Sequence, residues 1–163
     1  MKTSRLILIA CVLIGITAVA FTPSLRNGFT NWDDTAYVTD NLLIRSLSPE
    51  NLSKIFTTFQ LGFYHPLTLL SYACEYVCAG PNPQVYHATN LILHIMNTFL
   101  VFWFIYLLSG NQTAACITAL LFGIHPLHVE SVAWISERKD VLSTLFILAA
   151  LIAYIRYRTV GTR

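Results

Sequence analysis

Apolar residues are concentrated in four long runs, separated by polar segments of unequal length. The first run has no charge between Arg5 and Arg26, which leaves roughly the 20 residues that a helix needs to cross a bilayer. A retained helix is favoured over a cleaved signal peptide, because no small-residue cleavage motif follows and further apolar runs come later. The predicted membrane spans are residues 6–25, 86–108, 113–127 and 141–157.

Two shorter helices are predicted within the long polar segment 26–84. Ser48-Pro49-Glu50 has the order of an N-cap, a first-turn proline and an acid near the positive end of the helix, which predicts a surface helix over 49–59. The second helix, 66–79, is too short to cross a membrane and contains Glu75. Tyrosines at 64, 72 and 76 favour a helix that lies in the membrane interface.

Composition and charge support a membrane protein. Hydrophobic residues make up 55% of the chain and charged residues 11%, against roughly 45–50% and about 25% in soluble domains. The mean hydropathy is +0.60. A formal net charge of +2 is too small and too scattered for a nucleic-acid surface, so we expect no nucleic-acid partner.

The charges also predict sidedness. Four crossings place both termini on one side, and that side carries only basic residues: Lys2, Arg5, Arg156, Arg158 and Arg163. All acidic residues fall in the external loops 26–84 and 128–140: Asp33, Asp34, Asp40, Glu50, Glu75, Glu130, Glu137 and Asp140. The positive-inside rule then predicts cytoplasmic termini, most simply in a bacterial inner membrane.

Adjacent carboxylates follow the first span, in the sequence Asn31-Trp32-Asp33-Asp34. At a membrane face, one carboxylate could act as a general base on an acceptor hydroxyl while its neighbour orients it. An Asp pair is also a common turn or helix-cap motif, so the residues alone leave both interpretations open.

The second external loop holds a denser group of polar side chains. Arg138 and Lys139 are suited to a lipid phosphate, the first as a planar fork and the second as a point charge, or they simply solvate the loop. His125, His128 and Glu130, together with His65 of a second His-Pro-Leu sequence, are candidates for a substrate cavity. A hydrogen-bonded loop is favoured over a metal site, so we expect no metal and no cofactor.

A polar stripe crosses the second predicted span: His87, Asn90, His94 and Asn97 recur at helical spacing. Polar side chains inside a membrane helix face a protein neighbour or a cavity rather than lipid. Bonding between helices and contact with substrate are both compatible with this stripe.

Four segments together resemble a known family: NGFTNWDDTAYV, YHPLTLLSYACEY, NPQVYHATNLILHIMNTFLVF and HPLHVESVAWISERKDVLSTLF. In this order they are similar to the N-terminal part of the transmembrane and tetratricopeptide-repeat O-mannosyltransferase-like proteins, especially bacterial relatives, within the GT-C superfamily of membrane glycosyltransferases. The resemblance implies an all-α membrane protein with a partial GT-C fold, in which four transmembrane helices join juxtamembrane helices on the outer face.

The resemblance also implies a reaction. A polyprenyl-phosphate sugar would be the donor, and a hydroxyl, such as that of protein Ser or Thr, would be the acceptor. Asp33 or Asp34 would correspond to the catalytic acidic motif, the first member being the base, and the sugar would be transferred with inversion. Arg138 and Lys139 would bind the donor phosphate.

The chain departs from this family in its length, since it contains no 34-residue repeat and no further spans. We therefore expect a fragment or a truncated member. A noncatalytic membrane anchor or assembly module is the alternative function. A transporter subunit has less support because the chain shows no inverted repeat.

Overall fold

The computed structural model describes residues 3–160, so the predicted terminal charges Lys2 and Arg163 lie outside the described residues. Within this range the chain is helical and contains no strand, apart from one isolated bridge between Gln60 and Phe63. Seven α-helices are joined by short 3-10 or π turns: α1 Thr3–Phe21, α2 Pro49–Thr57, α3 Pro66–Ala79, α4 Pro83–Ser109, α5 Gln112–Ile124, α6 Val129–Ala133 and α7 Arg138–Val160.

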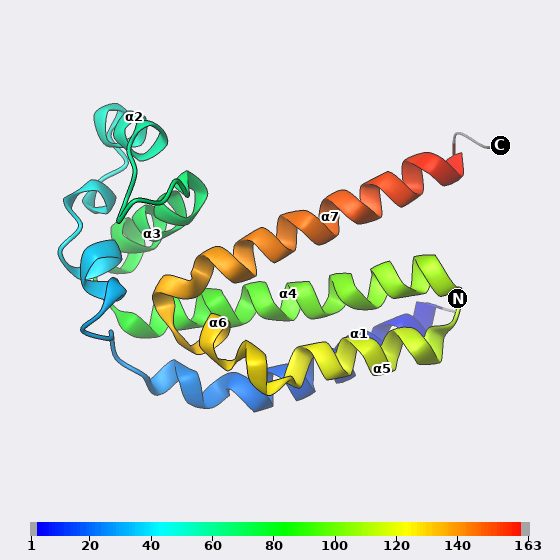
Figure 1. Cartoon of the computed structure of the whole chain (residues 1–163). Helices are drawn as coiled ribbons and strands as arrows, with labels where there is room; N and C mark the ends of the chain where they lie inside the picture. Colours follow the sequence, from blue (N-terminus) through cyan, green and yellow to red (C-terminus); the bar gives the residue numbers. More distant parts are fainter. Residues whose placement is uncertain (1–2, 161–163) are drawn as a thin grey trace.

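α4 is the central helix of a bundle that also contains α1, α5 and α7 (Figure 1). α4 and α5 form an antiparallel hairpin, in which Gly110 adopts the left-handed conformation and Asn111 caps α5 by accepting from the backbone N–H groups of Thr113 and Ala114. Both ends of the described chain lie at this hairpin's end of the bundle (Figure 1). The opposite end, which we call the loop end, carries residues 27–82 and 125–137.

Three helical segments are long and apolar enough to cross a membrane, namely Ser4–Arg26, Pro83–Ser109 and Ile135–Thr159. Several such helices in one chain are typical of a multi-pass membrane protein. The predicted span 113–127 differs from the structure, because α5 ends at Ile124 and the chain continues over Pro126–Ala133 at an angle of 47°. A proline lacks the N–H needed for a continuous helix, which explains the break.

Small residues allow α5 to approach its neighbours closely. Ala115 and Ala119 are fully buried on one face of α5, and Gly123 continues that face. A Cβ on Gly123 would lie 2.6 Å from Thr17 Oγ1 of α1 and 2.9 Å from Thr98 Cγ2 of α4. Such spacing of small residues is typical of helix contacts in membranes.

The polar stripe of α4 bonds to backbone carbonyls of neighbouring segments. Asn90 Nδ2 donates to Trp134 O at 3.0 Å, and Asn97 Nδ2 donates to Val141 O at 2.7 Å. His94 Nε2 lies 3.1 Å from Gly123 O, and His87 Nε2 lies 3.4 Å from Gly28 O. Interhelical bonding, one of the two interpretations of this stripe, is thus what the geometry shows, and it fastens both outer loops to α4.

The loop end has its own hydrophobic core beneath α2 and α3. Ser48 Oγ accepts from Asn51 N at 3.2 Å, as expected for the predicted N-cap, and Ile55 of α2 is fully buried. Tyr72 of α3 is also fully buried, with its hydroxyl donating to Ile135 O at 2.7 Å. Tyr72 therefore does not support the predicted interfacial helix, because this ring packs inward against Tyr86.

Candidate functional site

The two carboxylates of the acidic pair have different surroundings. Asp34 is fully buried: its Oδ2 accepts from Thr30 N at 2.9 Å, and its Oδ1 accepts from Ser136 N at 3.0 Å and from the Ser136 hydroxyl. Asp33 is partly exposed, and no group among residues 3–160 donates a hydrogen bond to its carboxylate. Asp34 is thus a structural link between the two loops, whereas Asp33 is open to a ligand.

The negative charge of Asp33 acts on the buried Tyr37 phenol. Burial raises the pKa of the Tyr37 phenol, and the negative charges of Asp33 and Glu137 raise it further. Both carboxylates therefore lie close to this phenol, although they are 104 positions apart in the sequence. The Tyr37 ring in turn packs on His65, at 5.1 Å between ring centroids.

Arg138 is the most enclosed charged group of the site. Its Nε donates to Asn90 Oδ1 at 2.8 Å, its Nη2 donates to Tyr86 O at 2.9 Å, and its Nη1 donates to Ser71 Oγ at 3.1 Å and to the carboxylate of Glu75. All three guanidinium nitrogens are used, and the side chain has no exposed surface. A phosphate could reach Arg138 only by displacing these partners.

Two aromatic rings complete the enclosure of this cation. The Arg138 guanidinium lies 4.5 Å from the centroid of the Tyr72 ring and 5.8 Å from that of Tyr86. Burial raises the pKa of Tyr72, which opposes any ionisation of that phenol. Each guanidinium nitrogen donates at least one hydrogen bond, and such pairing is what stabilises a buried cation.

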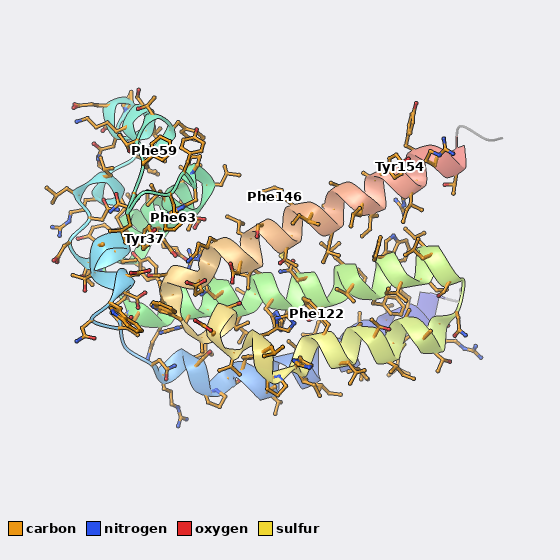
Figure 2. All side chains as sticks on the ribbon, viewed as in Figure 1. Tyr37, Phe59, Phe63, Phe122, Phe146 and Tyr154 are labelled. Atoms are coloured by element: carbon orange, nitrogen blue, oxygen red, sulfur yellow. The ribbon has the colours of Figure 1, made fainter. Side chains whose placement is uncertain are left out.

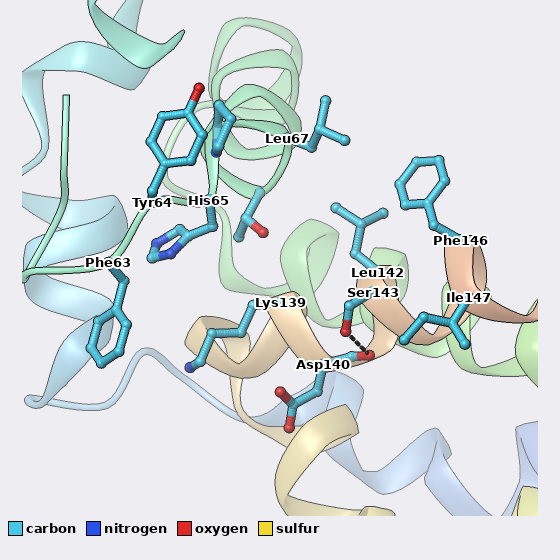
Figure 3. Close-up of a pocket in the computed structure, with 12 residues that line it drawn as sticks. Phe63, Tyr64, His65, Leu67, Lys139, Asp140, Leu142, Ser143, Phe146 and Ile147 are labelled. Atoms are coloured by element: carbon cyan, nitrogen blue, oxygen red, sulfur yellow. Dashed lines mark hydrogen bonds between the residues drawn. The ribbon is translucent and has the colours of Figure 1, made fainter. Parts of the chain in front are cut away.

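Lys139, the next residue, is accessible. Its side chain retains 32% of its exposure and forms an ion pair with Glu137 at 2.6 Å, while a second contact reaches Ser136 O at 3.3 Å. Lys139 lines an open cavity of about 730 Å³ between the start of α7 and residues 63–68 (Figure 3). A phosphate could compete with Glu137 for this ammonium group, since both are anions.

The cavity has a polar part and an apolar part. Lys139, Asp140 and His65 line one part, and Leu142, Phe146 and Ile147 line another part along α7 (Figure 3). Burial lowers the pKa of His65 and the positive charge of Lys139 lowers it further, so that this imidazole is neutral at pH 7. Its Nε2 is buried without a hydrogen-bond partner in the described structure. A polar head and an apolar tail would both find complementary surface in this cavity.

The other three residues predicted to line a substrate cavity, His125, His128 and Glu130, do not line the cavity that contains His65. His128 lines a separate pocket of about 30 Å³ with His94 and Asp140, while His125 Nδ1 accepts from Leu127 N at 3.2 Å and caps a short turn. Glu130 is exposed in the first turn of α6 and lines neither cavity. Among residues 3–160, no three His, Cys, Asp or Glu side chains are grouped so that they could hold a metal ion.

The sequence analysis missed several residues that build this site. Ser136 donates hydrogen bonds to Asp34, Glu75 forms an ion pair with Arg138, and Glu137 forms an ion pair with Lys139. Glu75 carried a detectable signal, because an isolated carboxylate in an apolar helix needs a partner when it is buried. Ser136 carried none, since one serine in a polar loop has no distinguishing pattern.

The fold and the site thus define an all-helical, multi-pass membrane protein with a polar centre at the loop end of its bundle. No family model matches the chain, and no solved structure is similar to it. The chain is 30% identical over 158 residues to human "Protein O-mannosyl-transferase TMTC3", a match that covers 89% of this chain and 16% of that protein. It is 34% identical over 158 residues to mouse "Protein O-mannosyl-transferase TMTC1", which covers 90% of this chain and 17% of that protein.

A third relative, human "Protein O-mannosyl-transferase TMTC2", is 38% identical over 94 residues, or 58% of this chain and 11% of that protein. The homologues of this chain are therefore protein O-mannosyl-transferases, which supports the resemblance to the O-mannosyltransferase-like family. The chain spans about one sixth of the length of the curated relatives it matches first. Its kinship with bacterial members and with the GT-C superfamily stays a prediction.

Proposed function

We propose that this chain forms the outer-face catalytic module of an integral-membrane glycosyltransferase that moves a sugar from a polyprenyl phosphate to an acceptor hydroxyl with inversion. The observation that carries the proposal is the bonding of Asp34 to Ser136, across 102 positions of sequence. It brings the acidic pair to the segment that precedes Lys139. The names of the relatives support mannose as the sugar and a protein hydroxyl as the acceptor.

Asp33 is the general base in this proposal. Its carboxylate is partly exposed, while the neighbouring Asp34 holds the loop in place through three hydrogen bonds. Asp33 takes the proton of the acceptor hydroxyl, and the hydroxyl oxygen forms a bond to the anomeric carbon. The bond between that carbon and the phosphate oxygen breaks on the opposite face, and the lipid phosphate leaves with the electron pair.

Lys139 binds the leaving phosphate, and Arg138 is assigned a positioning role. The ammonium group of Lys139 lines the cavity and has one anionic partner, Glu137, which a phosphate can replace. Arg138 instead connects α3 to α4 from the first position of α7 and so fixes the backbone that carries Lys139. This division of roles follows from burial, because only one of the two cations is exposed.

The prenyl chain lies along the apolar part of the cavity. Leu142, Phe146 and Ile147 follow Lys139 by one to two helical turns on α7, a helix that is long and apolar enough to span the membrane. The phosphate then stays at the loop end while the chain extends toward the bilayer centre. In this proposal the loop end faces the periplasm of a bacterial inner membrane, and both termini are cytoplasmic.

The test is transfer of radiolabelled mannose from polyprenyl-phosphate mannose to a Ser/Thr peptide, in membranes that contain the protein at its full genomic length. Asp33→Asn retains the size of the side chain but cannot accept the proton, and we expect transfer to fall about 10²–10⁴-fold. Asp40→Asn is the matched control, because Asp40 is an exposed carboxylate of the same loop.

Lys139→Met should raise the KM for the donor more than it lowers kcat, and Lys139→Arg should restore part of the affinity. Transfer at the wild-type rate by Asp33→Asn would remove the proposed base. An unchanged donor KM in Lys139→Met would remove the proposed phosphate contact.

A further inference from the structure

The connection between α2 and α3 forms a tight turn, residues 59–64, which we call the aromatic turn. Gln60 and Phe63 exchange two backbone hydrogen bonds of 2.9 Å, and the central residues Leu61 and Gly62 have φ angles of 49° and 83°. This is the geometry of a two-residue turn that favours Asn or Gly at both central positions. Leu61 is the single non-glycine residue with positive φ among residues 3–160.

A leucine at this position is conformationally unfavourable, and it places an apolar side chain at the tip of the turn. The neighbouring side chains are also apolar and exposed. The exposed fractions are 69% for Phe59, 52% for Leu61, 63% for Phe63 and 55% for Tyr64. Four large apolar side chains within six residues form a contiguous exposed group of a kind that marks an interaction site.

Side-chain hydrogen bonds tie the aromatic turn to the rest of the loop end. Gln60 Nε2 donates to Ala36 O at 2.9 Å, which ties the turn to the first outer loop. The Tyr64 hydroxyl donates to Phe56 O at 3.0 Å, and the rings of Phe59 and Tyr64 lie 5.6 Å apart.

Charge and position indicate the partner. No charged residue occurs between Lys54 and Glu75, so the turn and its flanks lack the groups that oppose insertion. Phe63 and Tyr64 line the same cavity as Phe146 and Ile147 of the membrane-spanning segment Ile135–Thr159. Figure 2 shows Phe59 and Phe63 beside α2 and α3, near the level along the bundle at which α7 begins. The turn and the first turns of α7 thus face the same open cavity, whose lining includes apolar side chains of a membrane-spanning segment.

We propose that the aromatic turn inserts into the lipid leaflet at the loop end, with Phe59, Leu61 and Phe63 below the head groups and the Tyr64 ring at the interface. Aromatic side chains favour this depth because one part of the ring system is apolar and another tolerates water. The turn then anchors α2 and α3, and the site beside them, at a fixed depth. This inference is independent of the proposed glycosyl transfer.

Spin labels test the insertion. In a variant whose cysteines Cys11, Cys74, Cys78 and Cys116 are replaced by alanine, a nitroxide is attached to Leu61→Cys in phosphatidylcholine–phosphatidylglycerol vesicles. The ratio of collisions with oxygen, which partitions into lipid, to collisions with a water-soluble nickel chelate is measured. Leu121→Cys on the exposed side of α5 is the lipid reference, and Glu50→Cys at the exposed start of α2 is the water reference.

We expect the ratio at Leu61 to equal that at Leu121 and to exceed that at Glu50 severalfold. Phe63→Cys repeats the measurement at a site with an ordinary φ angle and should agree. A ratio at the water reference would overturn the proposal. So would low collision rates with both reagents, because they would show the turn covered by protein, from a second copy or from another segment.

Discussion

The two outer loops each carry a pair of adjacent charges, and in both pairs one residue is buried while its neighbour is exposed. In the first loop Asp34 is buried and Asp33 is open, and in the second Arg138 is buried and Lys139 lines a cavity. The buried members bond to distant segments, Asp34 to Ser136 and Arg138 to Glu75 and Asn90. Of two neighbouring residues with the same charge, one therefore bonds to a distant segment and the other stays accessible.

The largest expected effect is a difference in stability between variants of Arg138 and Lys139. Arg138→Ala leaves the Glu75 carboxylate buried without its cation, and we expect the free energy of unfolding to fall by about 3–5 kcal/mol. Lys139→Ala removes a partly exposed ion pair and should cost less than about 1 kcal/mol. Unfolding of both variants in mixed micelles, followed by circular dichroism, measures the difference.

One further variant, Arg138→Lys, sharpens this test. Arg138→Lys restores the charge but not the planar fork, so it should recover part of the lost stability. If Arg138→Ala and Lys139→Ala lowered the free energy of unfolding equally, the proposed difference between a structural and an accessible cation would be wrong.

A smaller effect of the same kind is expected at the first pair. Asp34→Ala leaves Thr30 N and the N–H and hydroxyl of Ser136 without their acceptor, and should lower the free energy of unfolding by about 1.5–3 kcal/mol. Asp33→Ala should change it by no more than about 0.5 kcal/mol, because its carboxylate has no donor in the described structure. The same unfolding measurement applies, and a larger loss in Asp33→Ala would reverse the assignment.

The smallest effect concerns pH. The pKa of His65 is lowered in the folded protein by burial and by Lys139, so the unfolded chain binds a proton more readily. The stabilisation is complete above the unfolded pKa of about 6.5 and is lost as the pH falls through it toward the folded pKa. We therefore expect the melting temperature to drop between pH 8 and pH 5.5, and to drop less in His65→Gln.

Lys139→Met provides the control for this pH effect. Removing the ammonium group reduces the lowering of the His65 pKa, so the drop in melting temperature should shrink but not vanish, since burial is the larger cause. If the melting temperature of His65→Gln fell as much as that of the wild type, a titratable group other than His65 would cause the pH dependence.

The local pattern of the chain was sufficient for most helices of the structure. Ser48 and Pro49 start α2, and Pro66 starts α3, as the cap and proline signals indicate. The break after Ile124 was not foreseen, because a proline near the end of an apolar run is compatible with both a helix end and a bend. The burial of Tyr72 was not predicted for a similar reason, since a tyrosine suits both a membrane interface and a core in which its hydroxyl has a partner.

The sequence by itself determined that the chain lies in a membrane and that its acids gather between apolar segments, because hydropathy and charge are properties of local composition. It also identified Asp33, Asp34, Arg138 and Lys139 as unusual. Only the tertiary structure decided which member of each pair is buried, because burial depends on Ser136, Glu75 and Asn90, which are remote in the chain. Desolvation of a charge is tolerated where such partners converge, and no local pattern records that convergence.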